Sequence, residues 1–370
     1  MRAPLPWDAH VYPEIPAVEV PPEYEASFKV ARWLEKKLKG EDRKRLPPRR
    51  ERDTRPALPG KPPRELPPVV DRPALPAYFP EEPPAEKPPE QRKLLITIDD
   101  LPLADFDRRK SKRERQEIVE KLTAVLQKEQ VPFVAFMNME QDREDKNLLA
   151  PWQGTKATFG NHTWSHPHPR RAGTEAYIKD LKRGHEAVVP LREGAKGPMP
   201  FRYPYLYEGF PCEQRDAIRE TLRALDARNV PVTIDPWDWY YARRRLKALQ
   251  SKEAEDARLL EGAYMGSLQE ATLEAEWYAE ALFKRQPPQV LLLHGNTLVA
   301  DMLPETLNYF RDRGYTFVTL EEVWADPAYA EPDHTATPRG FSHWKRLMRS
   351  REGLGTCPVT EASEANKNAE

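Results

Sequence analysis

Two adjacent carboxylates, Asp99 and Asp100, end the apolar run from Leu94 to Ile98. The run predicts a buried strand, in which the pleat turns successive side chains in different directions. Two like charges this close indicate a cation site, where one Asp binds the ion and the other stays free to accept a proton. Asp also commonly ends strands and begins turns, so the pair alone leaves both interpretations open.

Two imidazoles four residues apart, His162 and His166, follow a later apolar run. A helical turn or a bent loop can bring both to one ion, although such a pair alone is a weak signal. Together with Asp100 they form a two-His, one-carboxylate set with open positions, which suits zinc first, and cobalt or ferrous iron as alternatives. We interpret the nearby His168 as a supporting or surface group.

Further polar residues follow the next apolar runs. Arg202 can hold a carboxylate with its bidentate guanidinium, and Pro204 fixes the backbone so that the Tyr205 amide faces a developing oxyanion. A packed aromatic turn with a surface Arg is the alternative interpretation of this stretch.

The last two candidate stretches are Asp235 to Trp239 and Leu292 to Asn296. The first interleaves carboxylates with indoles, as expected where sugar faces stack and a His must be oriented. A single His at a strand end, such as His294, is more often structural, but here it would join an existing cluster.

The elements that must position these residues alternate after Arg92. Seven strands are predicted at 94–98, 132–137, 157–159, 199–201, 231–234, 290–293 and 315–320, with helical connections at 112–130, 174–189 and 212–229. Helices of this length serve as crossovers between parallel strands, so the pattern predicts an α/β sheet or barrel. In such folds the chemistry gathers at the carboxyl ends of the strands.

The composition of the chain argues against several classes of function. The net charge of −1 shows no basic excess and does not suggest a nucleic-acid partner. No stretch approaches the roughly 20 apolar residues of a transmembrane segment, and the first ten residues lack the apolar core of a secretory signal. Cys212 and Cys357 are the only cysteines and lie far apart, so a disulfide framework is not expected.

The first ninety residues differ from the rest, since they hold 21 of the 40 prolines. One amphipathic helix is predicted at about 24–39, and residues 47–89 favour polyproline II or disorder. We therefore expect a proline-rich extension at 1–91, a main domain at 92–326 and a C-terminal extension at 327–370.

The five polar stretches, in this order, resemble the motifs of the NodB-type polysaccharide deacetylases, carbohydrate esterase family 4. Thr97 to Leu101 is similar to the family's Thr-Phe-Asp-Asp-Gly, and His162 to Pro167 to its His-Ser/Thr-x-x-His-Pro. The stretches at Arg202, Asp235 and Leu292 resemble the third, fourth and fifth motifs. The chain departs from the family at Leu101, which replaces a Gly and could narrow the acyl pocket or reshape the first loop.

The resemblance implies a distorted (β/α)7 barrel that removes acetyl groups from a carbohydrate with a divalent metal. It assigns Asp100, His162 and His166 as metal ligands, Asp99 as base and His294 as acid. Arg202 would orient Asp99, and Asp238 would partner His294. The residues that would contact substrate are Tyr205, Trp239 and Leu292.

Two other classes stay open, namely a metal-dependent amidohydrolase of a non-carbohydrate amide and a carbohydrate-binding pseudoenzyme. The family usually acts at the cell envelope or outside the cell, whereas the missing signal leaves a cytoplasmic location open. The sequence identifies no protein partner.

Overall fold

The computed structural model describes residues 91–104, 106–107, 110–140 and 148–358. The helix predicted at 24–39 and the proline-rich extension lie outside the described residues.

A parallel β-sheet forms the centre of the described chain. Its strands are β1 (Arg92–Leu101), β2 (Phe133–Met137), β3 (Ala157–Asn161), β4 (Met199–Phe201), β5 (Ala227–Asn229), β6 (Gln289–His294) and β7 (Tyr315–Phe317). The order is β5-β4-β3-β2-β1-β6, and β7 also pairs with β1. An isolated parallel bridge between Ile234 and Leu291 brings the segment after β5 beside β6 and curls the sheet towards closure. The predicted α/β class, a distorted (β/α)7 barrel, is confirmed.

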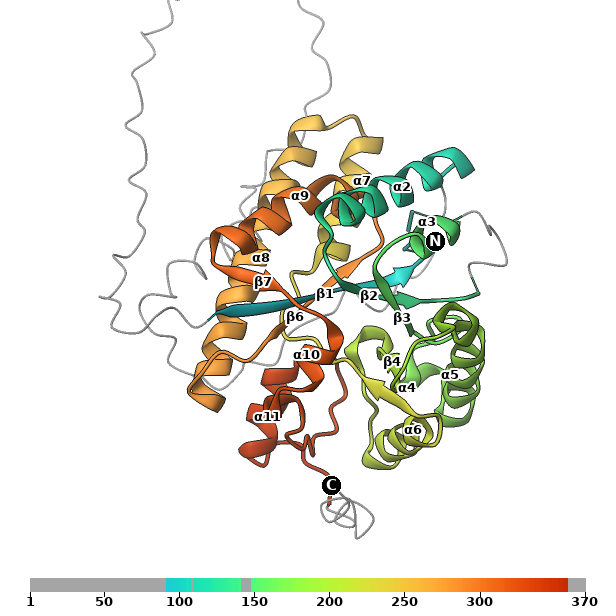
Figure 1. Cartoon of the computed structure of the whole chain (residues 1–370), viewed down its shortest axis with the longest axis vertical. Helices are drawn as coiled ribbons and strands as arrows, with labels where there is room; N and C mark the ends of the chain where they lie inside the picture. The colour runs from blue at the N-terminus through green and yellow to red at the C-terminus, as the bar shows by residue number, and fades with distance from the viewer. Residues whose placement is uncertain (1–90, 105, 108–109, 141–147, 359–370) are drawn as a thin grey trace, which may run out of the picture. The chain divides into compact units, whose positions relative to one another are not determined.

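Helices surround this sheet, as Figure 1 shows. They are α2 (Lys112–Glu129), α3 (Ala150–Gln153), α4 (Pro169–Ala172), α5 (Thr174–Val188), α6 (Cys212–Ala224), α7 (Asp238–Gln250), α8 (Ala254–Phe283), α9 (Thr297–Asp312), α10 (Leu320–Trp324) and α11 (His343–Arg351). Short 3-10 turns are η3 (Val189–Arg192), η4 (Pro204–Leu206) and η5 (Pro327–Tyr329). The long stretch between the fourth and fifth motifs is therefore the hairpin of α7 and α8.

The fifth strand lies earlier in the chain than predicted. The predicted strand at 231–234 makes only the isolated bridge at Ile234, while β5 occupies 227–229. The predicted helix at 212–229 accordingly ends at Ala224, because the left-handed backbone of Asp226 (φ 47°) turns the chain into β5. Polar Arg228 and Asn229 hid this short strand from the apolar pattern.

The core lies around β1 and β2. Leu94 to Ile98 are entirely or almost entirely buried, and every residue of β2 is buried. Strands covered by helices on both faces show such continuous apolar runs instead of alternation. The carboxyl end of β1 therefore extends from a deeply buried strand, which suits a site that needs fixed geometry.

The predicted C-terminal extension packs on the barrel as far as the structure describes it. Trp344 and Leu347 of α11 are fully buried in the main hydrophobic core. A disulfide joins Cys357 to Cys212 at the start of α6, so the expectation drawn from two distant cysteines is corrected to a single bond. Among the described residues, no helix is both long and apolar enough to cross a membrane.

Candidate active site

The carboxyl end of β1 presents both neighbouring carboxylates to one place. The pairing of β1 with β2 is irregular between Ile98 and Leu101, and Asp100 adopts a left-handed backbone (φ 61°). A bulge of this kind re-aims a side chain next to a functional site. Asp99 therefore stays in the barrel interior at 2% exposure, while the Asp100 carboxylate swings out towards the histidine loop.

Arg202 holds Asp99. Its Nη1 donates to both carboxylate oxygens of Asp99, at 3.1 and 3.2 Å, its Nη2 to Thr97 Oγ1 at 3.1 Å, and its Nε to the Val230 carbonyl at 2.8 Å. Burial raises the pKa of Asp99 to about 6, although the guanidinium acts in the opposite direction. A carboxylate fixed in this way is placed to accept a proton near neutral pH.

The three predicted ligands come together. One possible ligand atom from each of Asp100, His162 and His166 lies within 4.8 Å of the others. Asp100 Oδ1 is 3.6 Å from His162 Nε2 and 3.4 Å from His166 Nε2. Three donors at these separations fit around one divalent ion after small side-chain movements.

The hydrogen bond at the far side of the His162 ring favours such a ligand. His162 Nδ1 lies 2.8 Å from the Arg202 carbonyl oxygen, which can only accept. Nδ1 therefore carries the hydrogen, and Nε2 presents a lone pair towards Asp100. Burial, and then the neighbouring His166, lowers the pKa of His162 well below its usual range and keeps the ring neutral.

A second imidazole faces the site from β6. His294 stands opposite Asp99 in the register of β1 and β6, and its Nδ1 donates to Asp238 Oδ1 at 2.8 Å. Asp238 is fully buried and also accepts from Asn296 Nδ2 at 2.6 Å. Burial opposes the charged ring, yet the Asp238 carboxylate prevails and raises the pKa of His294 to about 10. The second nitrogen, Nε2, therefore carries a proton at neutral pH.

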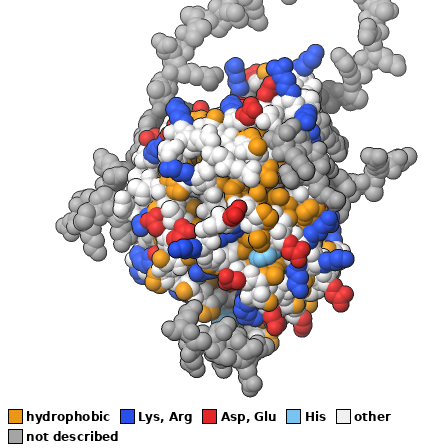
Figure 2. Space-filling model, turned by 45° about the vertical axis from the view of Figure 1, so that its right-hand side comes forward, with side chains coloured by type: hydrophobic (Ala, Val, Ile, Leu, Met, Phe, Trp, Pro, Cys, Tyr) orange, Lys and Arg blue, Asp and Glu red, His pale blue; other side chains and the backbone are white. Residues whose placement is uncertain are grey.

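The predicted substrate-contact residues differ in accessibility. Tyr205 is 54% exposed and its ring lies 4.6 Å from that of His166. Trp239 stacks on Trp237 with 6.2 Å between ring centroids, and Trp237 is 38% exposed. Leu292 is only 4% exposed and leaves little surface for a substrate. Figure 2 shows hydrophobic side chains gathered around a surface histidine on one face of the molecule.

The structure also places His168 and Leu101. His168 lies outside the ligand group, where its Nδ1 accepts from the Arg170 amide at 3.2 Å at the start of α4. Leu101 is fully buried, and its Cδ2 would lie 2.6 Å from a Cβ built at Gly295. Its side chain therefore packs beneath the loop after β6.

The motifs assigned no role to three supporting residues. Asn161 Oδ1 accepts from the Thr163 amide at 2.8 Å and holds the histidine loop, while Thr97 and Asn296 steady Arg202 and Asp238. Each is a polar residue at or next to a predicted strand end. That position is the only signal in the sequence that could have found them.

Comparisons with known proteins find a family match for part of the chain. Residues 86–230 match the model of the polysaccharide deacetylase family, and no curated protein matches the chain. The match includes Asp99, Asp100, His162, His166 and Arg202, whereas Asp238 and His294 lie beyond it.

Three similar solved structures carry related descriptions. A polysaccharide deacetylase from Bacillus cereus is 17% identical, with a TM-score of 0.43 over 69% of this chain and 99% of that one. A CE4 family pseudoenzyme from Bacillus anthracis is 14% identical (TM-score 0.43, 64% and 66%), and a family 4 carbohydrate esterase from Streptomyces lividans is 15% identical (TM-score 0.39, 60% and 90%). Likeness at this level says nothing about activity.

The family match covers the first three of the five motifs and ends before the last two. Residues 86–230 of this chain are similar to the polysaccharide deacetylases.

Proposed function

We propose that this chain is a metal-dependent hydrolase that removes N- or O-linked acetyl groups from a polysaccharide or related sugar. The observation that carries the proposal is the grouping of Asp100, His162 and His166 beside an Asp held by Arg202. A binding protein would need neither a fixed carboxylate nor a protonated imidazole at the same place.

Asp100, His162 and His166 would hold the metal, for which we propose zinc. The donor set fits because both rings point Nε2 at the Asp100 carboxylate and because His162 is neutral. When bound, a divalent ion supplies a Lewis acid that polarises the acyl carbonyl and lowers the pKa of water.

The remaining residues move protons and stabilise charge. Asp99, held rigid by Arg202, accepts the proton of the attacking water. The Tyr205 amide donates to the oxyanion that develops on the acyl oxygen. His294 then donates its Nε2 proton to the departing amine or alcohol, while Asp238 keeps the ring charged and oriented.

The exposed aromatic side chains favour a sugar over a small non-carbohydrate amide. Tyr205 and Trp237 each present a large exposed ring, and Trp239 lies stacked beside Trp237. Flat rings at a surface suit the apolar faces of a polymer's sugar units, whereas a small amide needs an enclosed pocket. An amidohydrolase of non-carbohydrate amides remains the second candidate, because its chemistry would use the same polar residues.

Acetate release tests the proposal. The full chain, loaded with zinc or cobalt, is assayed on chitin oligomers, peptidoglycan, acetylxylan and small N-acyl compounds. We expect acetate from at least one polymer, and loss of that activity on chelation. Release only from small N-acyl compounds would favour the amidohydrolase, and a metal-loaded protein without activity on any substrate would contradict both enzymes.

A further inference from the structure

The segment after the barrel reaches the proposed site. Residues 332–357, here called the C-terminal clasp, are fixed at several points. The disulfide holds Cys357 to α6, the His343 amide donates to the Val232 carbonyl at 2.6 Å, and Trp344 Nε1 donates to Gln289 Oε1 at 2.9 Å. The clasp is therefore bound to α6, to the segment after β5 and to the amino end of β6.

A buried charge network joins the clasp to the loop that follows β4. Arg346 of the clasp pairs with Asp333 at 2.5 Å and with Glu208 at 3.2 Å. Arg219 pairs with the same two carboxylates at 3.3 and 2.8 Å. Two cations and two anions balance each other, and Glu208 lies three residues after Tyr205, so the network fixes the far end of that loop.

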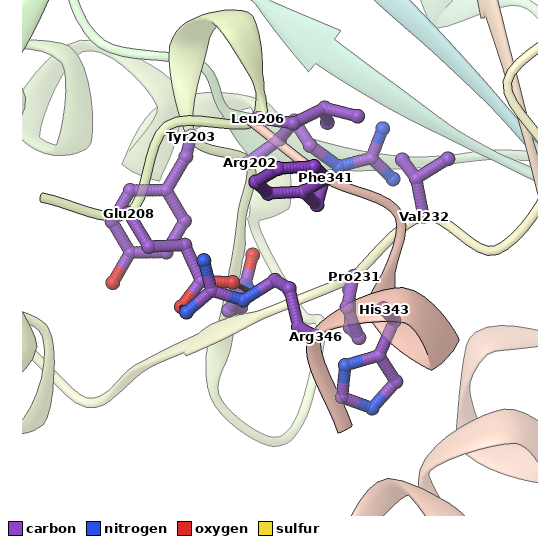
Figure 3. A pocket seen from close by; sticks show the side chains of 10 residues that line it. Arg202, Tyr203, Leu206, Glu208, Pro231, Val232, Phe341, His343 and Arg346 are labelled. Atoms are coloured by element: carbon purple, nitrogen blue, oxygen red, sulfur yellow. Dashed lines mark hydrogen bonds and ion pairs between the residues drawn. The ribbon is translucent and has the colours of Figure 1, made fainter. Parts of the chain in front are cut away.

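The joint between clasp and loop is closely packed. Figure 3 shows Phe341, His343 and Arg346 facing Arg202 and Tyr203 across a cavity of about 10 Å³. This volume admits about one water molecule and no larger ligand. The clasp therefore lies beside Arg202, the residue that holds Asp99.

The closest approach is at Gly340. A Cβ built at this glycine would overlap the Tyr205 carbonyl oxygen and lie 2.9 Å from Leu206 Cβ. Tyr205 and Leu206 both have left-handed backbones, with φ of 59° and 51°. Such conformations in two successive residues other than glycine persist only where the surroundings impose them. The Gly340 backbone packs against both Tyr205 and Leu206.

We propose that Gly340 is a positioning residue. Its contact with the Tyr205 carbonyl and with Leu206 holds Tyr205 in the left-handed backbone that lets the Tyr205 amide meet the oxyanion. The expected effect on catalysis rests on the proposed function. The expected effect on the Tyr205 backbone rests only on the contact with Gly340. Gly340 lies outside residues 86–230 and in none of the five motifs, so the clasp is a working part of the site that the motif order does not show.

The test compares two Gly→Ala variants of the full, metal-loaded chain. Gly340→Ala adds a methyl group against Tyr205, whereas the matched control Gly262→Ala adds one on α8, where no heavy atom lies within 4 Å. Amide hydrogen exchange is followed at Leu206 and Tyr207, whose amides donate to the carbonyls of Tyr203 and Pro204 at 3.1 Å each. kcat and KM for acetate release are measured in parallel.

We expect Gly340→Ala to speed exchange at both amides and to lower kcat by roughly 10- to 100-fold with KM and metal content unchanged, because the lost contact acts in the transition state. Gly262→Ala should match the wild type. Unchanged exchange and kcat in Gly340→Ala would overturn the proposal, as would an equal effect in both variants.

Two further arms keep the test decisive. If Gly340→Ala does not fold, Phe341→Ala takes its place, and faster exchange at Leu206 and Tyr207 is again required. If the wild-type chain releases no acetate, the proposed function fails on that result, while the exchange comparison still supports or overturns the positioning role.

Discussion

Two regions of the site each contain a buried imidazole, and they shift its pKa in opposite directions. In the β3 region, His162 Nδ1 donates to a neutral carbonyl, that of Arg202, and the pKa of the ring is lowered. In the β6 region, His294 Nδ1 donates to a carboxylate, that of Asp238, and the pKa is raised to about 10. Both rings present Nε2 to the site. Nε2 of His162 offers a lone pair, whereas Nε2 of His294 donates a proton.

The difference shows that the acceptor behind the ring sets its chemistry. Burial by itself opposes the charged form of both rings. Only an anionic partner within hydrogen-bond distance reverses that effect, and here Asn296 holds the anion in place. A metal ligand and a general acid can therefore be made from the same side chain within one barrel.

The largest expected effect separates the two histidines by metal content. His162→Ala should lose both the metal and the activity, because one of three ligands is gone. His294→Ala should keep the metal and lose roughly 10²- to 10⁴-fold in kcat, as general-acid removal does. Metal analysis together with steady-state kinetics checks both.

His168→Ala is the matched control, since His168 is an imidazole of the same loop outside the ligand group. It should retain its metal. A metal-free His294→Ala protein, or a His162→Ala protein with full metal and turnover, would remove the distinction between the two regions.

A smaller effect should follow from Asp238→Asn, which leaves the His294 ring in place without its anionic partner. Loss of the carboxylate should lower the pKa of His294 and the fraction of charged ring, and reduce kcat by roughly 10- to 100-fold. Because activity needs the protonated ring, the alkaline limb of the pH profile should move to lower pH. An alkaline limb that stays at its wild-type pH would show that a group other than His294 determines its position.

The smallest effect on activity concerns a third buried imidazole, His343, which lies outside the ligand group and has no catalytic role here. Burial lowers its pKa from 6.5 to about 4, so the unfolded chain binds this proton first as the pH falls. The folded state should lose about 3 kcal/mol between pH 6.5 and pH 4, with little further loss from this group below pH 4. His343→Phe, which keeps the ring stacked on Tyr329, should remove that loss.

Denaturant unfolding at several pH values measures this prediction. The wild-type free energy of unfolding should fall more steeply on acidification than that of His343→Phe, while activity at neutral pH stays similar. Parallel curves for the two proteins would mean that the His343 ring is not held neutral.

Some parts of this site could be predicted from the sequence, and others could not. Apolar runs at 94–98, 157–159 and 290–293 identified the strands β1, β3 and β6, because strands buried on both faces show continuous hydrophobicity. The short strand β5 was missed, since its Ala227–Asn229 sequence has no apolar run. Motif order brought together Asp100, His162 and His166 across more than sixty residues, which no local pattern could do.

The clasp could not be predicted, because its contribution depends on contacts between distant segments. Gly340 matters through its distance to Tyr205, and Arg346 through carboxylates at Glu208 and Asp333. Its disulfide partner, Cys212, is 145 residues away from Cys357. Neither spacing nor residue type in the C-terminal segment marks these contacts.

The proposed chemistry depends on a division of roles between Asp99 and Asp100. The direct measurement is bound metal per chain, taken with kcat, for Asp99→Asn and Asp100→Asn. We predict that Asp99→Asn keeps its metal and loses roughly 10²- to 10⁴-fold in kcat, whereas Asp100→Asn loses metal and activity together, because an amide is a poorer ligand than a carboxylate. An Asp99→Asn protein that is metal-free, or one that is fully active, would contradict the claim.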